Sequence, residues 1–222
     1  MNRYGRYSVL RGLMVCGLAA TCVACGATDE QLRKSSGYYQ EGLANLSSDR
    51  QRAFVSFQKA VQMNPKNRDA HYGLGHIYAQ QGKYEEAEAS FRKVLSIDPE
   101  HSESHTYLGQ VLTHRARWAE AVEEYKAALA NPLYATPDLA RFHMGRALVQ
   151  TGDLKGALSA YEDAATVKPP NVPPALLNLE LGRTYLALGM DQKAKETLGK
   201  VVSMDQGGEY GVAADHLLKQ AK

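Results

Sequence analysis

The chain has 222 residues, of which 44% are hydrophobic and 23% charged, and its formal net charge is +2. This composition is typical of a globular chain with enough apolar residues for a packed core. The near-balance of charge excludes the strongly basic surface of a nucleic-acid-binding protein and the acidic tail of a solubilising segment.

The N-terminal segment has the composition of a secretory signal. Arg3, Arg6 and Arg11 precede an uncharged run over residues 12–24. A helical run of about 13 residues is too short to cross a bilayer core of about 30 Å. The basic start, the apolar middle and the small residues at the end therefore predict a signal peptide over residues 1–24.

The three cysteines, Cys16, Cys22 and Cys25, all lie near this end of the chain. The stretch VACG, residues 23–26, resembles a bacterial lipobox, although Cys22 stands where a leucine is usual. The resemblance implies that Cys25 is lipidated and becomes the first residue of the mature chain. The alternative is a plain cleaved signal. Because glycine rather than aspartate follows the cysteine, resemblance to sorted lipoproteins implies a lipid anchor in the bacterial outer membrane, at its periplasmic face.

The rest of the chain repeats one pattern of small, aromatic and proline residues. Within residues 70–100 the pattern consists of Leu74-Gly75, Tyr78, Ala87, Phe91 and Pro99. Equivalent pairs follow at Leu108-Gly109, Met144-Gly145 and Leu181-Gly182. This pattern resembles the tetratricopeptide repeat (TPR), a pair of antiparallel helices with a period of about 34 residues. The resemblance implies an all-α fold, a right-handed solenoid of about five repeats, over residues 35–67, 68–101, 102–137, 138–174 and 175–208.

Glycine and proline predict where the helices end. Gly82, Gly152 and Gly189 suit a left-handed cap at the turn inside a repeat, and prolines such as Pro99 are expected to end second helices. Residues 209–222 carry an apolar stripe and are predicted to be a capping helix over the last open face of the solenoid. Residues 25–34 are predicted to be a polar tether between the lipid and the repeats.

No motif in the sequence indicates catalysis. The sequence has no strand followed by a glycine-rich phosphate loop, and no cysteine would remain free as a nucleophile after processing. His101 and His105 have a spacing that would allow a shared metal. His71 and His105, however, occupy equivalent repeat positions, which favours packing. We therefore predict a protein that is not an enzyme and that takes no cofactor, metal or small-molecule substrate.

The first helix of each TPR lines the concave side of the solenoid, and the resemblance places certain repeat positions in that groove. The predicted partner-binding groove consists of Tyr72, His76, Gln110, Leu139, Phe142, Arg146, Val149, Leu176, Leu179 and Arg183. Its C-terminal half is apolar with two arginines. Exposed apolar residues at repeated positions predict a docking strip for an amphipathic helix or an extended segment, with the arginines on acidic groups. The alternative is that the C-terminal cap or tight curvature buries this strip.

A short stretch between two repeats adds a narrower resemblance. Together with the signal, the lipobox and the repeats, it resembles the TPR pilotin lipoproteins of type IV pilus systems, and its matching residues are Asn131, Pro132, Leu133, Tyr134 and Pro137. The resemblance implies binding to the outer-membrane secretin subunit, promotion of its targeting and multimerisation, and support of pilus biogenesis and twitching motility. The alternative is another envelope scaffold, an adaptor for peptidoglycan enzymes or an assembly factor for outer-membrane proteins.

Overall fold

The computed structural model describes residues 27–220, in which every regular element is an α-helix. The signal peptide, Cys25 and the last two residues lie outside the described residues. The helices are α1 Asp29–Asn45, α2 Arg50–Met63, α3 Arg68–Gln80, α4 Tyr84–Ile97, α5 Ser102–His114, α6 Trp118–Leu129, α7 Pro137–Thr151, α8 Leu154–Ala165, α9 Pro174–Ala187, α10 Asp191–Met204 and α11 Glu209–Gln220.

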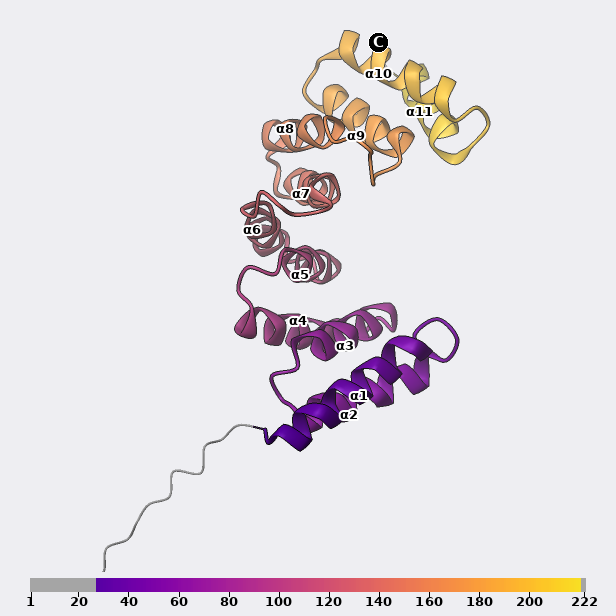
Figure 1. The fold of residues 1–222 in the computed structure, drawn as a ribbon. Helices are drawn as coiled ribbons and strands as arrows, with labels where there is room; N and C mark the ends of the chain where they lie inside the picture. The colour runs from indigo at the N-terminus through magenta and orange to yellow at the C-terminus, as the bar shows by residue number, and fades with distance from the viewer. Residues whose placement is uncertain (1–26, 221–222) are drawn as a thin grey trace, which may run out of the picture.

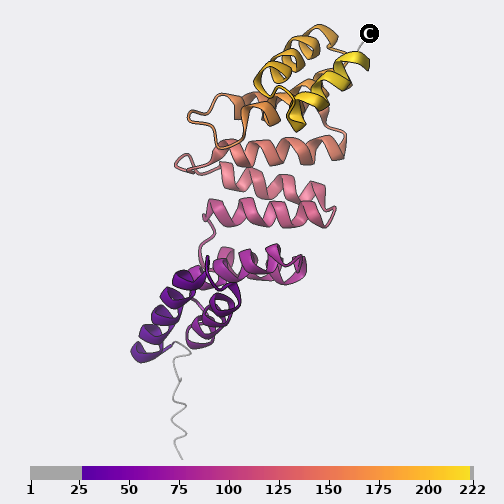
Figure 2. The same cartoon turned by 90° about the vertical axis from the view of Figure 1, so that its right-hand side faces the viewer.

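The helices form hairpins that stack in chain order. Each odd-numbered helix up to α9 packs against the helix that follows it, and each of α2, α4, α6 and α8 also packs on the next hairpin. The stack runs from α1 at one end to α10 and α11 at the other (Figure 1). The view turned by 90° shows the same succession of layers (Figure 2). The predicted all-α TPR solenoid is confirmed, and α11 covers its C-terminal end by packing on α9 and α10.

Each hairpin is closed by a glycine that faces a large side chain. A methyl group at Gly75 would lie 2.8 Å from the ring of Phe91, and one at Gly109 would lie 2.6 Å from the ring of Tyr125. The same pairing recurs in the other three hairpins, as Gly42 with Phe57, Gly145 with Tyr161 and Gly182 with Leu198. The missing side chain lets the two helices approach closely, so the repeated glycines seen in the sequence are packing residues.

The turns inside the hairpins adopt a left-handed backbone. Gly82, Gly152 and Gly189 have φ angles of 72°, 84° and 71°, as their positions predict. The third hairpin has an alanine at this place, and Ala116 has a φ angle of 55°. This conformation costs an L residue with a side chain about 1–2 kcal/mol. The turn between α5 and α6 is therefore the strained member of the set.

Replacing Ala116 with glycine is expected to raise the free energy of unfolding by about 0.5–1 kcal/mol, because relief of strain exceeds the entropy that glycine adds to the unfolded chain. Urea denaturation followed by far-UV circular dichroism measures the change. The reciprocal substitution Gly82→Ala, at the equivalent turn, should lower the same quantity. An Ala116→Gly protein no more stable than the wild type would contradict the assignment of strain.

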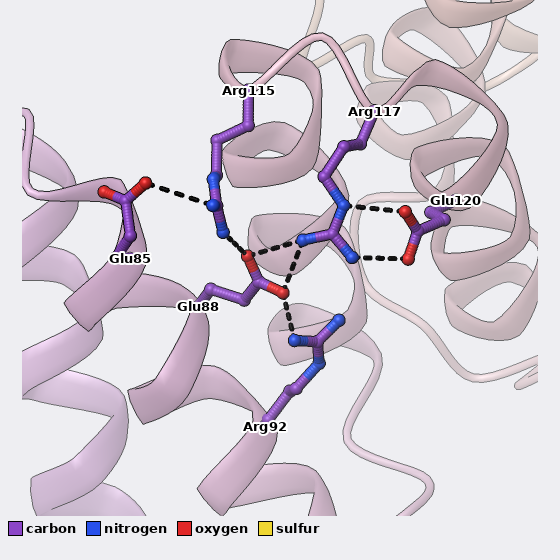
Figure 3. A network of polar contacts seen from close by, with 6 residues as sticks. All are labelled: Glu85, Glu88, Arg92, Arg115, Arg117 and Glu120. Carbon is purple, nitrogen blue, oxygen red and sulfur yellow. Dashed lines mark hydrogen bonds and ion pairs between the residues drawn. The ribbon is translucent and has the colours of Figure 1, made fainter.

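A buried carboxylate joins the second and third hairpins. Only 4% of the Glu88 side chain in α4 is exposed. It accepts hydrogen bonds from Arg117 Nη1 at 2.7 and 2.9 Å and also pairs with Arg115, and both arginines stand in the turn between α5 and α6. Figure 3 shows the complete network of Glu85, Glu88, Arg92, Arg115, Arg117 and Glu120. The strained turn thus presents two arginines to the neighbouring hairpin.

The predicted tether, residues 25–34, overlaps the start of α1, which begins at Asp29. Thr28 caps the helix. Gln31 N donates to Thr28 Oγ1 at 3.3 Å, and Thr28 N donates to Gln31 Oε1 at 2.8 Å. The carboxylates of Asp29 and Glu30 lie in the first turn, where they favour the positive end of the helix dipole. The polar segment from Asp29 onward therefore forms the first turns of a helix.

Candidate functional site

An apolar cleft of about 330 Å³ lies on the inner side of the first two hairpins, between α1 and α3. We call it the N-terminal cleft. It is lined by Tyr39, Leu43, Leu46, Arg50, Phe57, Asp69, Tyr72, Gly73, His76, Ile77 and Gln80. Leu43 in α1 and Leu46, which caps its C-terminal end, are 43% and 38% exposed, which is high for large apolar side chains. Exposed apolar side chains around a concave site are characteristic of a surface that receives a partner.

The floor of the N-terminal cleft is rigid. Phe57 of α2 is fully buried, and its ring lies between Gly42 of α1 and Gly73 of α3. A methyl group at Gly73 would lie 2.7 Å from this ring, so no side chain separates the aromatic floor from the α3 backbone. The cleft is therefore a preformed hollow, and its shape depends on Phe57 and Gly73.

A second hollow of about 320 Å³, the middle cleft, lies between α3 and α5. It is lined by His76, Ala79, Gln80, Tyr84, Tyr107, Gln110, Val111 and His114. The rings of Tyr84 and His114 stack on one another with centroids 4.7 Å apart. The side-chain amides of Gln80 and Gln110 make no hydrogen bond within residues 27–220. The middle cleft therefore offers amide donors and acceptors to the main chain of a ligand.

An aromatic ridge of Tyr72, His76 and Tyr107 separates the two clefts. The ring centroids of Tyr72 and His76 are 4.5 Å apart, and those of His76 and Tyr107 are 4.0 Å apart. Burial lowers the pKa of His76 to about 4, so this imidazole is neutral at physiological pH. The ridge links α3 to α5 and gives both clefts an uncharged aromatic wall.

The structure places three of the predicted groove residues around these clefts. Tyr72 and His76 line the N-terminal cleft, and His76 and Gln110 line the middle cleft. These residues of the N-terminal half of the predicted groove therefore surround the two hollows, whereas the predicted docking strip lies in the C-terminal half.

The predicted exposed strip of Phe142, Leu176 and Leu179 is wrong for two of its members, since Phe142 and Leu179 are each only 3% exposed. Phe142 belongs to the core around Tyr161, and Leu179 packs against Ala214 of α11. Their repeat position lies between consecutive hairpins and does not point freely into solvent. Leu179 is thus covered by the C-terminal cap, the alternative that the sequence left open.

The remaining predicted residues of the C-terminal half are spread around this core. Leu139, Val149 and Leu176 are half-buried against it. Arg146 is exposed, with its guanidinium carbon 6.0 Å from the centre of the Phe142 ring. Arg183 Nη1 pairs with Glu180 Oε1 at 2.9 Å on its own helix. The C-terminal half therefore presents two arginines but little free apolar surface.

Sequence reasoning missed the contribution of α1. Leu32, Tyr39, Leu43 and Leu46 recur at spacings of seven, four and three residues, which places them on one face of a helix. The first half of the first repeat departs from the register of the other repeats, with Tyr38 and Gly42 displaced by one residue from the pattern. The apolar stripe of α1 was nevertheless visible, and it would have identified the wall of the N-terminal cleft.

Two further features, a cluster of metal ligands and a membrane-spanning helix, are not found among the described residues. Residues 27–220 contain no group of three or more histidine, cysteine, aspartate or glutamate side chains placed to hold a metal ion. His105 instead contacts Glu124 Oε2 at 2.7 Å and the carbonyl of Pro99 at 2.9 Å. None of the helices described is both long and apolar enough to span a bilayer.

Comparison with known proteins supports an interaction role. Four models of the tetratricopeptide repeat match residues 51–82, 69–101, 108–175 and 175–207. An uncharacterized protein of Methanocaldococcus jannaschii, MJ0572, is 35% identical over 60 residues, which are 27% of this chain and 70% of that protein.

Solved structures resemble most of the chain. YrrB, a TPR protein with an unusual peptide-binding site, is 26% identical with a TM-score of 0.71, over 86% of this chain and 94% of YrrB. PilW, a widely conserved type IV pilus biogenesis factor, is 27% identical with a TM-score of 0.66, over 76% of each chain. PilF of Pseudomonas aeruginosa is 18% identical with a TM-score of 0.67, over 86% of this chain and 93% of PilF, and shares the fold alone. The repeat matches and the stacked hairpins together show that the chain belongs to the tetratricopeptide repeat family, whose solenoids are scaffolds for protein–protein interaction.

Proposed function

We propose that this protein is a lipid-anchored TPR adaptor of type IV pilus biogenesis that binds the secretin subunit in the N-terminal and middle clefts. In this proposal Cys25 carries the lipid and holds the solenoid at the periplasmic face of the outer membrane. The clefts hold an apolar segment of the secretin monomer, which promotes targeting and multimerisation of the ring through which the pilus exits. Tethering at the assembly site raises the local concentration of secretin without any chemical step.

The observation that carries the proposal is the pair of preformed clefts, one apolar and one with free amides. Such a surface matches a segment that buries apolar side chains and presents its main chain, the form in which unassembled subunits expose their interfaces. The likeness to PilW supports a pilus role over other envelope scaffolds. The resemblance of residues 131–137 to pilotins supports the secretin as the partner.

The decisive experiment places charge in the N-terminal cleft. Cells that carry Leu43→Glu with Leu46→Glu are expected to lose heat-resistant secretin multimers at least about tenfold, because burying a carboxylate against Phe57 removes more than about 1.4 kcal/mol of binding. Immunoblots of secretin multimers and a twitching assay are the readouts. Deletion of the gene should give the same loss.

The control is Val55→Glu, which adds one carboxylate at a side chain as exposed as Leu46, 38% in each case, but outside the clefts; Leu46→Glu alone is its counterpart with equal charge inside the N-terminal cleft. The Val55→Glu variant should keep normal multimers. Normal multimers in the deletion strain would end the secretin proposal. Equal loss in the cleft and control variants would show that the effect comes from folding and not from the cleft.

A further inference from the structure

The most exposed large apolar side chain in the described residues lies outside the lining of both clefts. Leu133 is 88% exposed, in the connection between α6 and α7. The next most exposed are Val212 at 61% and Met204 at 56%. An apolar side chain so fully in solvent contributes little to folding stability.

The backbone around Leu133 is fixed on both sides. Leu133 N donates to Asn131 Oδ1 at 2.9 Å, and Tyr134 N donates to the carbonyl of Asn131 at 3.2 Å. Tyr134 is only 7% exposed, and its hydroxyl lies 2.9 Å from Thr106 Oγ1 in a buried hydrogen bond. The loop therefore holds the backbone of Leu133 in place, which lowers the entropy that a partner loses in ordering it.

A pocket of about 390 Å³ adjoins this loop, and we call it the edge pocket. Its wall includes the apolar side chains of Pro99, Ala127, Ala130 and Pro132, the last of which directly precedes Leu133. His105 lies against it, held in place by Glu124 and by the carbonyl of Pro99. No residue of the edge pocket lines either cleft, so the edge pocket is a separate surface.

The rim of the edge pocket carries one carboxylate that is available to a partner. The exposed carboxylate of Glu100 stands on its rim and forms no ion pair within residues 27–220. The carboxylate of Glu124 lies behind the rim and is paired with His105. We infer that Leu133 and the edge pocket form a second docking surface, which takes a short segment of a partner protein with apolar side chains next to a lysine or arginine. The apolar side chains would pack on Leu133 and in the pocket, and the cation would pair with Glu100. This inference does not depend on the secretin as a partner.

The test uses the purified chain and a random 12-residue peptide library displayed on phage. Peptides enriched on the wild type are synthesised with a fluorophore, and their dissociation constants are measured by anisotropy. We expect a class with apolar residues beside lysine or arginine whose affinity falls at least about tenfold with Leu133→Ser and with Glu100→Lys. The same peptides should bind Met204→Ser, the matched loss of an exposed apolar side chain, as they bind the wild type.

Three outcomes would overturn the inference. The first is that no enriched peptide loses affinity with Leu133→Ser, or that those which do are acidic. The second is a dimer of the wild type in light scattering that Leu133→Ser dissociates, which assigns the surface to a second copy of the chain. The third is binding to phosphatidylethanolamine–phosphatidylglycerol vesicles that Leu133→Ser abolishes, which assigns it to lipid. Leu133 is too exposed for its replacement to impair folding, and thermal melting checks this.

Discussion

Replacement of Glu88 by glutamine is expected to lower the free energy of unfolding by about 2–3 kcal/mol at neutral pH. Removing one partner from a fully buried ion pair costs about 3–5 kcal/mol, because the remaining charge stays unpaired. Here the side chains of Arg92, Arg115 and Arg117 keep 51%, 29% and 31% exposure, so water screens part of that cost. Urea denaturation followed by far-UV circular dichroism gives the value.

The pH dependence of this loss identifies the charge as its cause. Burial works to raise the pKa of Glu88, but hydrogen bonds from Arg117 and Arg115 and the charge of Arg92 outweigh it and hold the pKa below the ordinary 4.5. A lowered folded-state pKa stabilises the fold above the unfolded-state pKa, and this contribution disappears as the pH falls through the folded-state pKa. The difference between wild type and Glu88→Gln should therefore be constant from about pH 5 to 8 and shrink below about pH 4.5.

Glu120 provides the matched control, because it pairs with the same Arg117 but its side chain is 55% exposed. Glu120→Gln should cost far less than Glu88→Gln, because solvent screens an exposed ion pair. A Glu88→Gln protein as stable as Glu120→Gln would show that the network is only a surface feature. The network connects α4 to the turn before α6, so we also expect its loss to loosen the packing between the hairpins that form the middle cleft.

Gly109→Ala is expected to lower the free energy of unfolding by about 1–3 kcal/mol, although alanine favours helices more than glycine does. The new methyl group would lie 2.6 Å from the ring of Tyr125. That ring cannot withdraw easily, because Tyr125 is fully buried and its hydroxyl lies 3.3 Å from Thr113 Oγ1. Helix propensity alone would predict that this substitution raises the free energy of unfolding.

Gly199→Ala is the control for the direction of this change in the free energy of unfolding. Gly199 lies inside α10, and a methyl group there would meet no atom within 4 Å. It should therefore raise the free energy of unfolding by about 0.5–1 kcal/mol, the gain of alanine over glycine in an open helix position. If Gly109→Ala were also stabilising, the close contact between glycine and aromatic ring would not be what holds the hairpin together.

The repeat pattern predicted the helical hairpins because the same local packing recurs in each of them. Gly75 with Phe91 and Gly109 with Tyr125 are contacts inside one hairpin, so their spacing in the chain sets them directly. The left-handed turns at Gly82, Gly152 and Gly189 are likewise local. The start of α1 is also encoded locally, in the Thr28 cap and Gln31. The polar composition of this segment led instead to the prediction of a tether.

The sequence did not predict the contacts between hairpins, because these contacts depend on how the hairpins are stacked. The sequence placed Phe142 and Leu179 on an open groove, and the stacking of neighbouring hairpins and of α11 buried them. The clefts formed instead beside α3, where α1 and its C-cap contribute Leu43 and Leu46 to the N-terminal cleft.

By itself the sequence determined the helices, their turns and the hairpin as the unit of the fold, because these depend on residues close together in the chain. Only the tertiary structure decided which of the inward-facing positions remain open to a partner. That outcome depends on the distance between consecutive hairpins and on the placement of the cap, which arise from contacts between segments far apart in the chain.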